Sequence, residues 1–188
     1  RQFTSSAPYP KFDQDNKCSS SLLEFESVDA EYITRLIRSS PNKNCSLDPV
    51  PTWILKQYCA ELVPFITFLV NTSLKDGVFP TTQKRAMIMP ILKKPSLDPH
   101  DAANYRPISN LSYLSKLLER CVNDQIHNYL SKNDLLPAVQ SAYRKHHSTE
   151  TAVLKVLSDI YSAADAGKVT LMGLLDSSAA FDTVDHCI

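Results

Sequence analysis

The longest periodic segment of the sequence predicts one long helix over about residues 112–131. Mostly apolar side chains recur there at helical spacing and mark a single face. That face comprises Leu114, Leu117, Leu118, Cys121, Val122, Gln125, Ile126, Tyr129 and Leu130. Lys116 and Arg120 fall on the other side of the helix, where most charged residues simply face solvent. A chain containing such a helix must supply other elements to cover its apolar face.

Further helices are predicted on both sides of this segment. Residues 28–38 carry a helical apolar face, and helical spacing also runs from Trp53 to about Leu74, with Pro64 as a break or restart and Gly77 as the stop. A helix over about 148–165 has Ser148 as N-cap, Glu150 in its first turn and Gly167 at its end. Its predicted core face comprises Val153, Val156, Leu157, Ile160 and Tyr161.

Two segments read as extended chain. Residues 84–92 predict a strand, and Pro90 places it at an edge or at its end, because proline cannot donate to a ladder. Pro107 keeps the preceding Arg106 extended. The apolar run from Val169 to Leu175 ends in Asp176 and predicts a buried strand with a carboxylate at its tip. A plain strand followed by an Asx-type turn is the alternative interpretation of this last segment.

Composition limits the class of protein. The 188 residues are 43% hydrophobic and 21% charged, which suits one globular domain. Charge or proline interrupts the longest apolar runs, so we expect neither a membrane span nor a signal peptide. Five cysteines, an odd number with no CxxC pair, indicate reduced thiols and an intracellular protein, with nucleus and cytoplasm both open.

The formal net charge of zero hides an uneven distribution. Residues 84–145 contain ten Lys/Arg and five Asp/Glu, a balance of +5, and the remainder contains ten and fifteen, a balance of −5. A basic middle between acidic flanks favours a surface that binds a polyanion. An ordinary solvated surface is the alternative. His146 and His147 are adjacent and cannot share one face of a helix or strand, which argues against a metal there.

The wording of the last segment, LLDSSAAFDTVDH, resembles the first catalytic motif of reverse transcriptases from LINE-type (non-LTR) retrotransposons. The usual family wording is LLDLSAAFDTVDH, so the sequence departs from it at Ser177. The resemblance implies that Asp176 is a catalytic, metal-binding aspartate. It also implies that Phe181 binds the nucleotide, lying under the incoming sugar.

The resemblance extends back through the chain to about residue 46. DPVPTWILK and the segment ending in PILKK are similar to the region that leads into these enzymes. NYRPISNL resembles the first fingers motif and implies nucleotide contacts for Arg106 and Lys116. QSAYRKHHSTETA resembles the second fingers motif and implies nucleic-acid contacts for Gln140 and Arg144. The family commonly has glycine where this sequence has Ala142, which would cost roughly 1 kcal/mol if that site needs a positive φ.

The resemblance implies an α+β fold, a partial right-hand polymerase with fingers and the start of the palm after a helical lead-in. Expected parts are an arm with one helix over 1–45, the lead-in over 46–83, and an incomplete polymerase domain over 84–188 with the first palm strand. The implied activity is RNA-directed DNA synthesis with Mg²⁺ or Mn²⁺ on an RNA template, from a DNA primer and deoxynucleoside triphosphates. The oligomeric state is left open.

The family takes its other catalytic acids from a Tyr-x-Asp-Asp hairpin, and the 188 residues contain no Asp-Asp dipeptide. We therefore expect this chain to be inactive by itself. A non-catalytic, nucleic-acid-binding remnant of a degenerate retroelement is the alternative reading.

Overall fold

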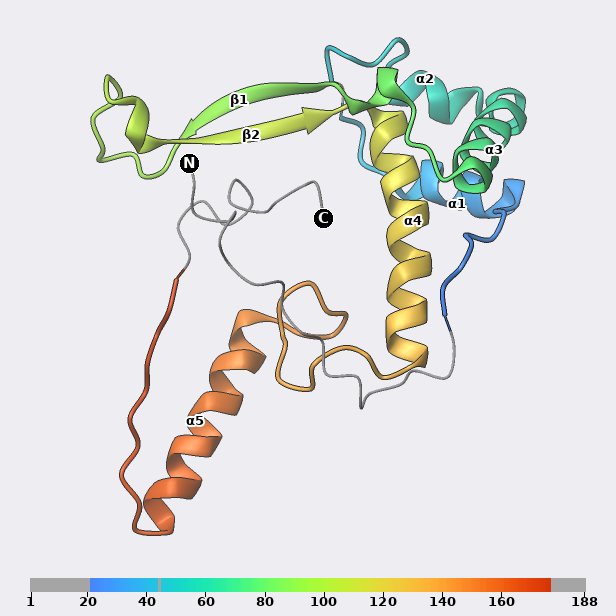
Figure 1. Ribbon diagram of the computed structural model, residues 1–188. Helices are drawn as coiled ribbons and strands as arrows, with labels where there is room; N and C mark the ends of the chain where they lie inside the picture. Colours follow the sequence, from blue (N-terminus) through green and yellow to red (C-terminus); the bar gives the residue numbers. More distant parts are fainter. Residues whose placement is uncertain (1–20, 44, 177–188) are drawn as a thin grey trace, which may run out of the picture. The chain divides into compact units, whose positions relative to one another are not determined.

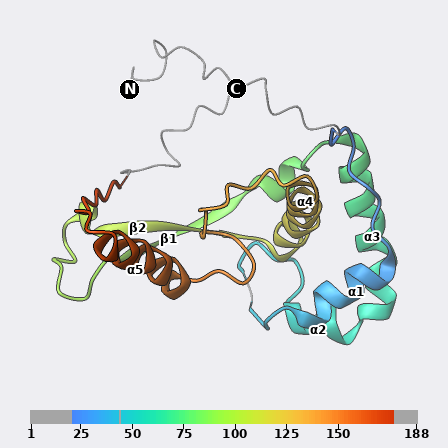
Figure 2. The ribbon, with the colours of Figure 1, turned by 90° about the horizontal axis from the view of Figure 1, so that it is seen from below.

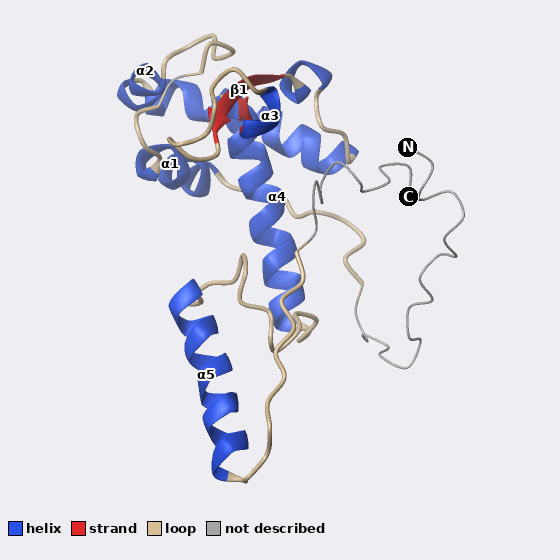
Figure 3. Ribbon diagram, turned by 90° about the vertical axis from the view of Figure 1, so that its left-hand side faces the viewer, coloured by secondary structure: helices blue, strands red, loops and turns tan. Residues whose placement is uncertain are grey.

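The computed structural model describes residues 21–43 and 45–176 (Figure 1). The described residues fall into two units, one over 21–135 and the other over 136–176, and each is described by itself. Helices and one small sheet make up the regular structure of these residues, as Figure 3 shows in blue and red. This mixture agrees with the predicted α+β class.

The first unit is organised around four helices, which lie where the sequence predicted helical chain. They are α1 (Ala30–Ser39), α2 (Thr52–Gln57), α3 (Cys59–Asp76) and α4 (Tyr113–Lys132). Asp29 and Ser112 cap α1 and α4 by accepting backbone N–H groups of the first turn, and Gly77 ends α3 with a φ of 62°.

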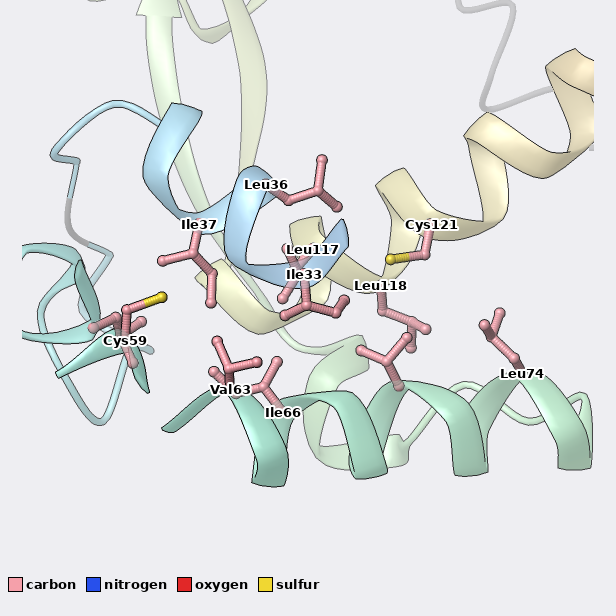
Figure 4. Packing of buried hydrophobic residues seen from close by; sticks show 12 residues of the cluster. Ile33, Leu36, Ile37, Cys59, Val63, Ile66, Leu74, Leu117, Leu118 and Cys121 are labelled. Carbon is pink, nitrogen blue, oxygen red and sulfur yellow. The ribbon is translucent and has the colours of Figure 1, made fainter. Parts of the chain in front are cut away.

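Side chains from these helices meet in one apolar core (Figure 4). Ile33 and Ile37 of α1, with Leu118 and Cys121 of α4, are buried almost completely, and α3 supplies the opposite wall. The full set is Ile33, Leu36, Ile37, Leu55, Cys59, Val63, Ile66, Val70, Leu74, Leu117, Leu118 and Cys121. Burying one large aliphatic side chain contributes roughly 1.5–3 kcal/mol, so this core is the main source of the unit's stability. Helix α1 is therefore part of the core, while the expected boundaries at residues 45 and 83 stay a prediction.

The helix break expected at Pro64 lies elsewhere. Helix α3 continues through Pro64, and the interruption between α2 and α3 is at Tyr58, whose backbone has φ −104° and ψ 37°. Proline in a helix interior removes one backbone hydrogen bond. Val63 and Ile66, on both sides of the proline, are buried in the core, and their burial offsets that cost.

A two-stranded antiparallel hairpin projects from the helices of this unit (Figures 1 and 2). A short 3₁₀ turn, η1 (Thr81–Lys84), leads into β1 (Ala86–Leu92), and a second, η2 (Ala102–Asn104), leads into β2 (Tyr105–Leu111). Pro90 lies opposite Pro107 in the register. Neither proline has an N–H to donate to a neighbouring strand. Both lie in edge strands, because a two-stranded sheet has no central strand, and this is the position predicted for Pro90.

The second unit contains α5 (Thr149–Asp165), at the predicted place. Ser148 accepts the N–H of Thr151, and the Thr151 hydroxyl accepts the N–H of Ser148, which completes a capping box. Gly167 follows the helix with a φ of 69°. The predicted core face is wrong, because no residue of α5 is buried.

The strand predicted over 169–175 is also wrong. Residues 168–176 have no regular secondary structure, and Val169 and Leu175 are 98% and 100% exposed. A strand is defined by its hydrogen-bonded neighbour, and the two strands of the described residues, β1 and β2, pair with each other. The apolar pattern indicated burial but carries no information on whether a pairing strand is present.

Among residues 21–43 and 45–176, no helix is both long and apolar enough to cross a membrane.

Candidate functional site

A pocket of about 500 Å³ lies in the first unit, where the hairpin meets the helices. It is bounded by the end of α1, the loop that follows α1, the start of α4 and one face of the hairpin. Its lining residues are Leu36, Ser40, Pro41, Lys43, Cys45, Ser46, Asp48, Met87, Met89, Asn110, Tyr113, Lys116, Leu117 and Arg120. Lys116, one of the residues that the sequence singled out, is thus on the pocket wall.

Asp48 fixes the loop at the pocket's edge to helix α4. Its Oδ1 accepts the N–H of Tyr113 at 2.5 Å, and its Oδ2 accepts the N–H of Cys45 at 2.9 Å. Tyr113 is the first residue of α4, where a carboxylate also interacts favourably with the helix dipole. The Cys45 thiol donates to the carbonyl of Asn110 on β2, at 3.8 Å. The loop therefore contacts both the helix and the hairpin.

Ser40 joins three elements at the inner side of the pocket. Its hydroxyl shares a 3.0 Å hydrogen bond with the Tyr113 hydroxyl, and its carbonyl accepts from Lys56 Nζ at 2.5 Å. Burial raises the pKa of the Tyr113 hydroxyl, while the Ser40 hydrogen bond and the nearby Arg120 charge act in the opposite direction. Tyr113 is thus a neutral hydrogen-bonding group at physiological pH.

The pocket carries an excess of positive charge. Lys43, Lys116 and Arg120 line it, and Asp48 is its one carboxylate. In the part of the chain that the structure describes, the sole ion pair is Lys155–Asp159, so these three cations have no carboxylate within ion-pair distance. The three cations therefore remain available to an anion.

Arg106 lies on the same hairpin face as the pocket but nearer the tip. It is paired with Ile91 across the strands, and side chains of residues 106, 108 and 110 alternate onto one face with Met87 and Met89. Arg106 is four residues from Asn110, which is about 13 Å along a strand. The structure therefore brings Arg106 and Lys116 to the same side of the hairpin without placing them in contact.

Gln140 and Arg144 lie in the second unit, in the turn that precedes α5. The Gln140 amide donates to the carbonyl of Ala142 at 3.2 Å, and the Arg144 guanidinium donates to the carbonyl of Pro137 at 3.0 Å. Positive φ values occur at Tyr143 (59°) and His146 (62°), not at Ala142. The strain considered for Ala142 is therefore absent, and the neighbouring tyrosine adopts the left-handed backbone instead.

Asp176 is the last described residue, and Phe181 lies outside the described residues. No group of three His, Cys, Asp or Glu side chains among residues 21–43 and 45–176 is placed to hold a metal. One exposed carboxylate does not make a site for the divalent cations that the resemblance implies. Asp176 by itself therefore does not complete a metal site within the described residues.

Sequence reasoning missed Asp48, Tyr113 and Lys43, and it treated Arg120 as surface. Two features of the sequence could have pointed to these residues. One is the DPVP segment, which begins with Asp48, and the other is the spacing of Lys116 and Arg120, four residues apart on one helix face. The hydrogen bond from residue 113 to residue 48 spans 65 positions and has no local signal.

Comparison with known proteins defines the class. The family model described as reverse transcriptase (RNA-dependent DNA polymerase) matches residues 91–188. This match covers more than half of the chain, so the chain belongs to the reverse transcriptase family.

The relatives specify which reverse transcriptases are similar. A probable RNA-directed DNA polymerase from transposon BS of Drosophila melanogaster is 30% identical over 165 residues, 87% of this chain and 18% of the relative. A probable RNA-directed DNA polymerase from transposon X-element of the same fly is 29% identical over 80% of this chain and 16% of that protein. The RNA-directed DNA polymerase from mobile element jockey of Drosophila funebris is 27% identical over 87% of this chain and 18% of the relative.

The chain spans less than a fifth of the length of these relatives, which are non-LTR retrotransposon polymerases.

Proposed function

We propose that this chain is the nucleotide- and template-binding portion of an RNA-directed DNA polymerase of a non-LTR retrotransposon. It corresponds to the fingers and the start of the palm of a right-hand polymerase, with a helical lead-in before them. Residues 84–188 form the incomplete polymerase domain in this proposal. Its partners are an RNA template, a DNA primer and deoxynucleoside triphosphates, inside the cell.

The observation that carries the proposal is the position of the family match. Residues 91–188 include every residue singled out for the site: Arg106, Lys116, Gln140, Arg144, Asp176 and Phe181. The residues outside the match form most of the helical core that supports α4. A support that holds a basic helix and hairpin in place suits a surface that must position a polyanion.

Each residue has a distinct part in this proposal. Arg106 and Lys116 neutralise the triphosphate of the incoming nucleotide, and both are exposed cations on one side of the hairpin. Gln140 and Arg144 contact the template strand, for which Arg144 has guanidinium N–H groups beyond the one bound to Pro137. The aromatic ring of Phe181 excludes nucleotides whose sugar is ribose.

Asp176 supplies one metal ligand in the proposed polymerase, and Mg²⁺ or Mn²⁺ assists phosphoryl transfer when bound. A second and third carboxylate must come from residues outside those described. This chain's own contribution is therefore binding and orientation of the strands and the nucleotide.

Fluorescence anisotropy with a labelled single-stranded RNA tests the binding function. Phosphate contacts release counterions, so affinity should fall linearly on logarithmic axes as salt rises. Arg144→Gln should weaken binding and reduce the salt slope by about 0.7, the value for one phosphate contact to a single strand. Lys132→Gln is the matched control, because it also removes one positive charge, from an exposed residue at the end of α4. Binding that does not respond to salt, or no binding at low salt, contradicts the proposal.

A further inference from the structure

We propose that the pocket between the hairpin and α4 binds a small amphipathic anion, a ligand with an apolar body about the size of one or two rings and a single anionic group. This inference goes beyond the proposed polymerase function, because it concerns a reversible small-ligand site and no step of nucleotidyl transfer. The volume of about 500 Å³ lies within the range of small-molecule sites in proteins.

The apolar part of the wall suits the ligand's body. Leu36 and Leu117 are buried members of the core, and their side chains form part of the pocket lining. Met87 and Met89 contribute from one hairpin face and are 43% and 53% exposed. Methionine adapts to ligands of different shape because its chain is unbranched and its sulfur is polarizable. A ring inserted here would remove these exposed apolar surfaces from water.

The polar part of the wall suits one negative group. Lys43 comes from the loop after α1, while Lys116 and Arg120 come from successive turns of α4. The carboxylate that could have neutralised them, Asp48, already accepts two backbone N–H groups. The pocket thus has a net charge of +2 on its lining side chains, three cations against one carboxylate. A sulfonate, carboxylate or phosphate would form charge-assisted hydrogen bonds with them.

Internal hydrogen bonds hold the pocket wall in place before any ligand arrives. The Thr52 hydroxyl donates to the carbonyl of Lys43 at 2.6 Å, and Asp48 joins the same loop to α4. Tyr113 is fixed by its bond to Ser40. A site that is already ordered does not lose loop entropy on binding, which favours affinity for a small ligand.

Cys45 provides a local readout, because it lines the pocket and its thiol is only partly buried. A bound ligand should slow its alkylation by iodoacetamide. Cys59 and Cys121 are buried, so their low reactivity reports that the unit is folded in every sample. Tryptic digestion yields residues 44–56 as one peptide that contains Cys45 and no other cysteine, so mass spectrometry measures this thiol alone.

The experiment compares three probes on the full 188-residue chain: 1-anilinonaphthalene-8-sulfonate, adenosine 5′-monophosphate and inorganic sulfate. At a ligand concentration about ten times its Kd, the unliganded fraction and the alkylation rate should fall about tenfold. Protection by the naphthalene sulfonate indicates a free small molecule as the source of the ligand, and protection by the nucleotide alone indicates a nucleotide. Equal protection by sulfate at the same concentration would contradict the need for an apolar body, and no protection by any probe would overturn the proposal.

Arg120→Gln tests the cationic part of the site. The concentration needed for half-protection should rise about tenfold, the effect of losing one charge-assisted hydrogen bond. Lys132→Gln is the control, because Lys132 has the same charge on the same helix and lies outside the pocket lining. An identical shift in both variants would show general electrostatics and overturn the site. Neither residue belongs to the proposed nucleotide contacts, so RNA binding measured in parallel separates failure of this inference from failure of the polymerase proposal.

Discussion

Asp48 accepts the backbone N–H of Tyr113 at 2.5 Å, joining the loop before α2 to the first residue of α4. The same carboxylate accepts the N–H of Cys45, so one side chain satisfies two backbone donors from segments far apart in sequence. This relationship sets the position of α4, which carries Lys116 and Arg120, relative to the loop that carries Lys43. Asp48 and Tyr113 both line the pocket.

Replacement of Asp48 should destabilise the first unit in a graded way. Asp48→Asn keeps one oxygen acceptor and should lower the free energy of unfolding by about 1 kcal/mol, while Asp48→Ala leaves both N–H groups without this partner and should lower it by about 2–3 kcal/mol. Urea unfolding followed by circular dichroism measures both. Asp98→Asn is the control, because the Asp98 carboxylate accepts the nearby N–H of His100 in an exposed turn. An equal loss at Asp98 would contradict the importance of the long-range contact.

Asp134 follows α4 in a left-handed conformation, with a φ of 53°. The N–H of Leu135 donates to the carbonyl of Leu130, and the N–H of Asp134 donates to that of Ser131, the pattern of a Schellman motif. Glycine suits this position better than aspartate, and a carboxylate at a helix C-terminus is unfavourable. Asp134→Gly should therefore raise the free energy of unfolding by about 0.5–1 kcal/mol.

Thermal and urea unfolding of Asp134→Gly beside Asp134→Asn separates the two causes. Asparagine removes the charge while keeping a side chain at the left-handed position. If Asp134→Asn reproduces the whole gain, charge and not backbone conformation is responsible.

Stability should fall at alkaline pH because of Cys121. Burial, followed by the charge of Asp124, raises the pKa of the Cys121 thiol from 9.0 to about 11. The pKa of this thiol is higher in the folded state than in the unfolded state. Its contribution to the free energy of unfolding is therefore complete below about pH 9 and is lost as the pH rises toward 11. The expected loss over this window is about 2–3 kcal/mol. Tyr32, which donates to Asp124 Oδ2 at 2.7 Å, also has a raised pKa and adds to the loss above pH 10.

Urea unfolding from pH 7 to 11 under reducing conditions measures this dependence. Cys121→Ala should be less stable at pH 7 because of the cavity it creates, yet its stability should fall less steeply above pH 9. Val70→Ala removes buried volume from a residue that does not titrate and should keep the original slope. Parallel pH curves for the original chain and Cys121→Ala would contradict the assignment.

The sequence predicted the helices of the first unit well because their signals are local. Apolar spacing, the Ser112 cap and Gly77 are all readable within one helix length. The error at Pro64 arose because the burial of Val63 and Ile66 is a tertiary effect. Residues 169–175 show the same limit: their apolar run carries no record of a pairing strand. For the candidate site, residue types pointed to Lys116, but only the fold brought it together with Lys43 and Arg120.

The turn before α5 shows how a site residue can have a structural contact as well. Arg144 donates to the carbonyl of Pro137 and closes the turn in which Tyr143 has its left-handed backbone. Arg144→Lys keeps the charge for a phosphate but replaces the planar guanidinium that makes this contact. We expect weaker RNA binding, by a few fold, with an unchanged salt slope. A lowered salt slope in this variant would show that the charge itself, and not the shape of the turn, is what the substitution affects.

Catalysis tests the proposed role of Asp176. Primer extension on an RNA template, with Mg²⁺ or Mn²⁺, should give no product from the 188-residue chain, because one carboxylate cannot organise two metal ions. In a polymerase that carries this chain together with a Tyr-x-Asp-Asp hairpin, Asp176→Asn should reduce extension to background while RNA affinity changes less than about twofold, since the substitution alters a metal ligand and not the basic residues that hold the strand. Phe181→Ala in the same protein should instead retain extension and admit ribonucleotides. Extension by the isolated chain, or by the Asp176→Asn polymerase, would show that Asp176 is not the catalytic ligand.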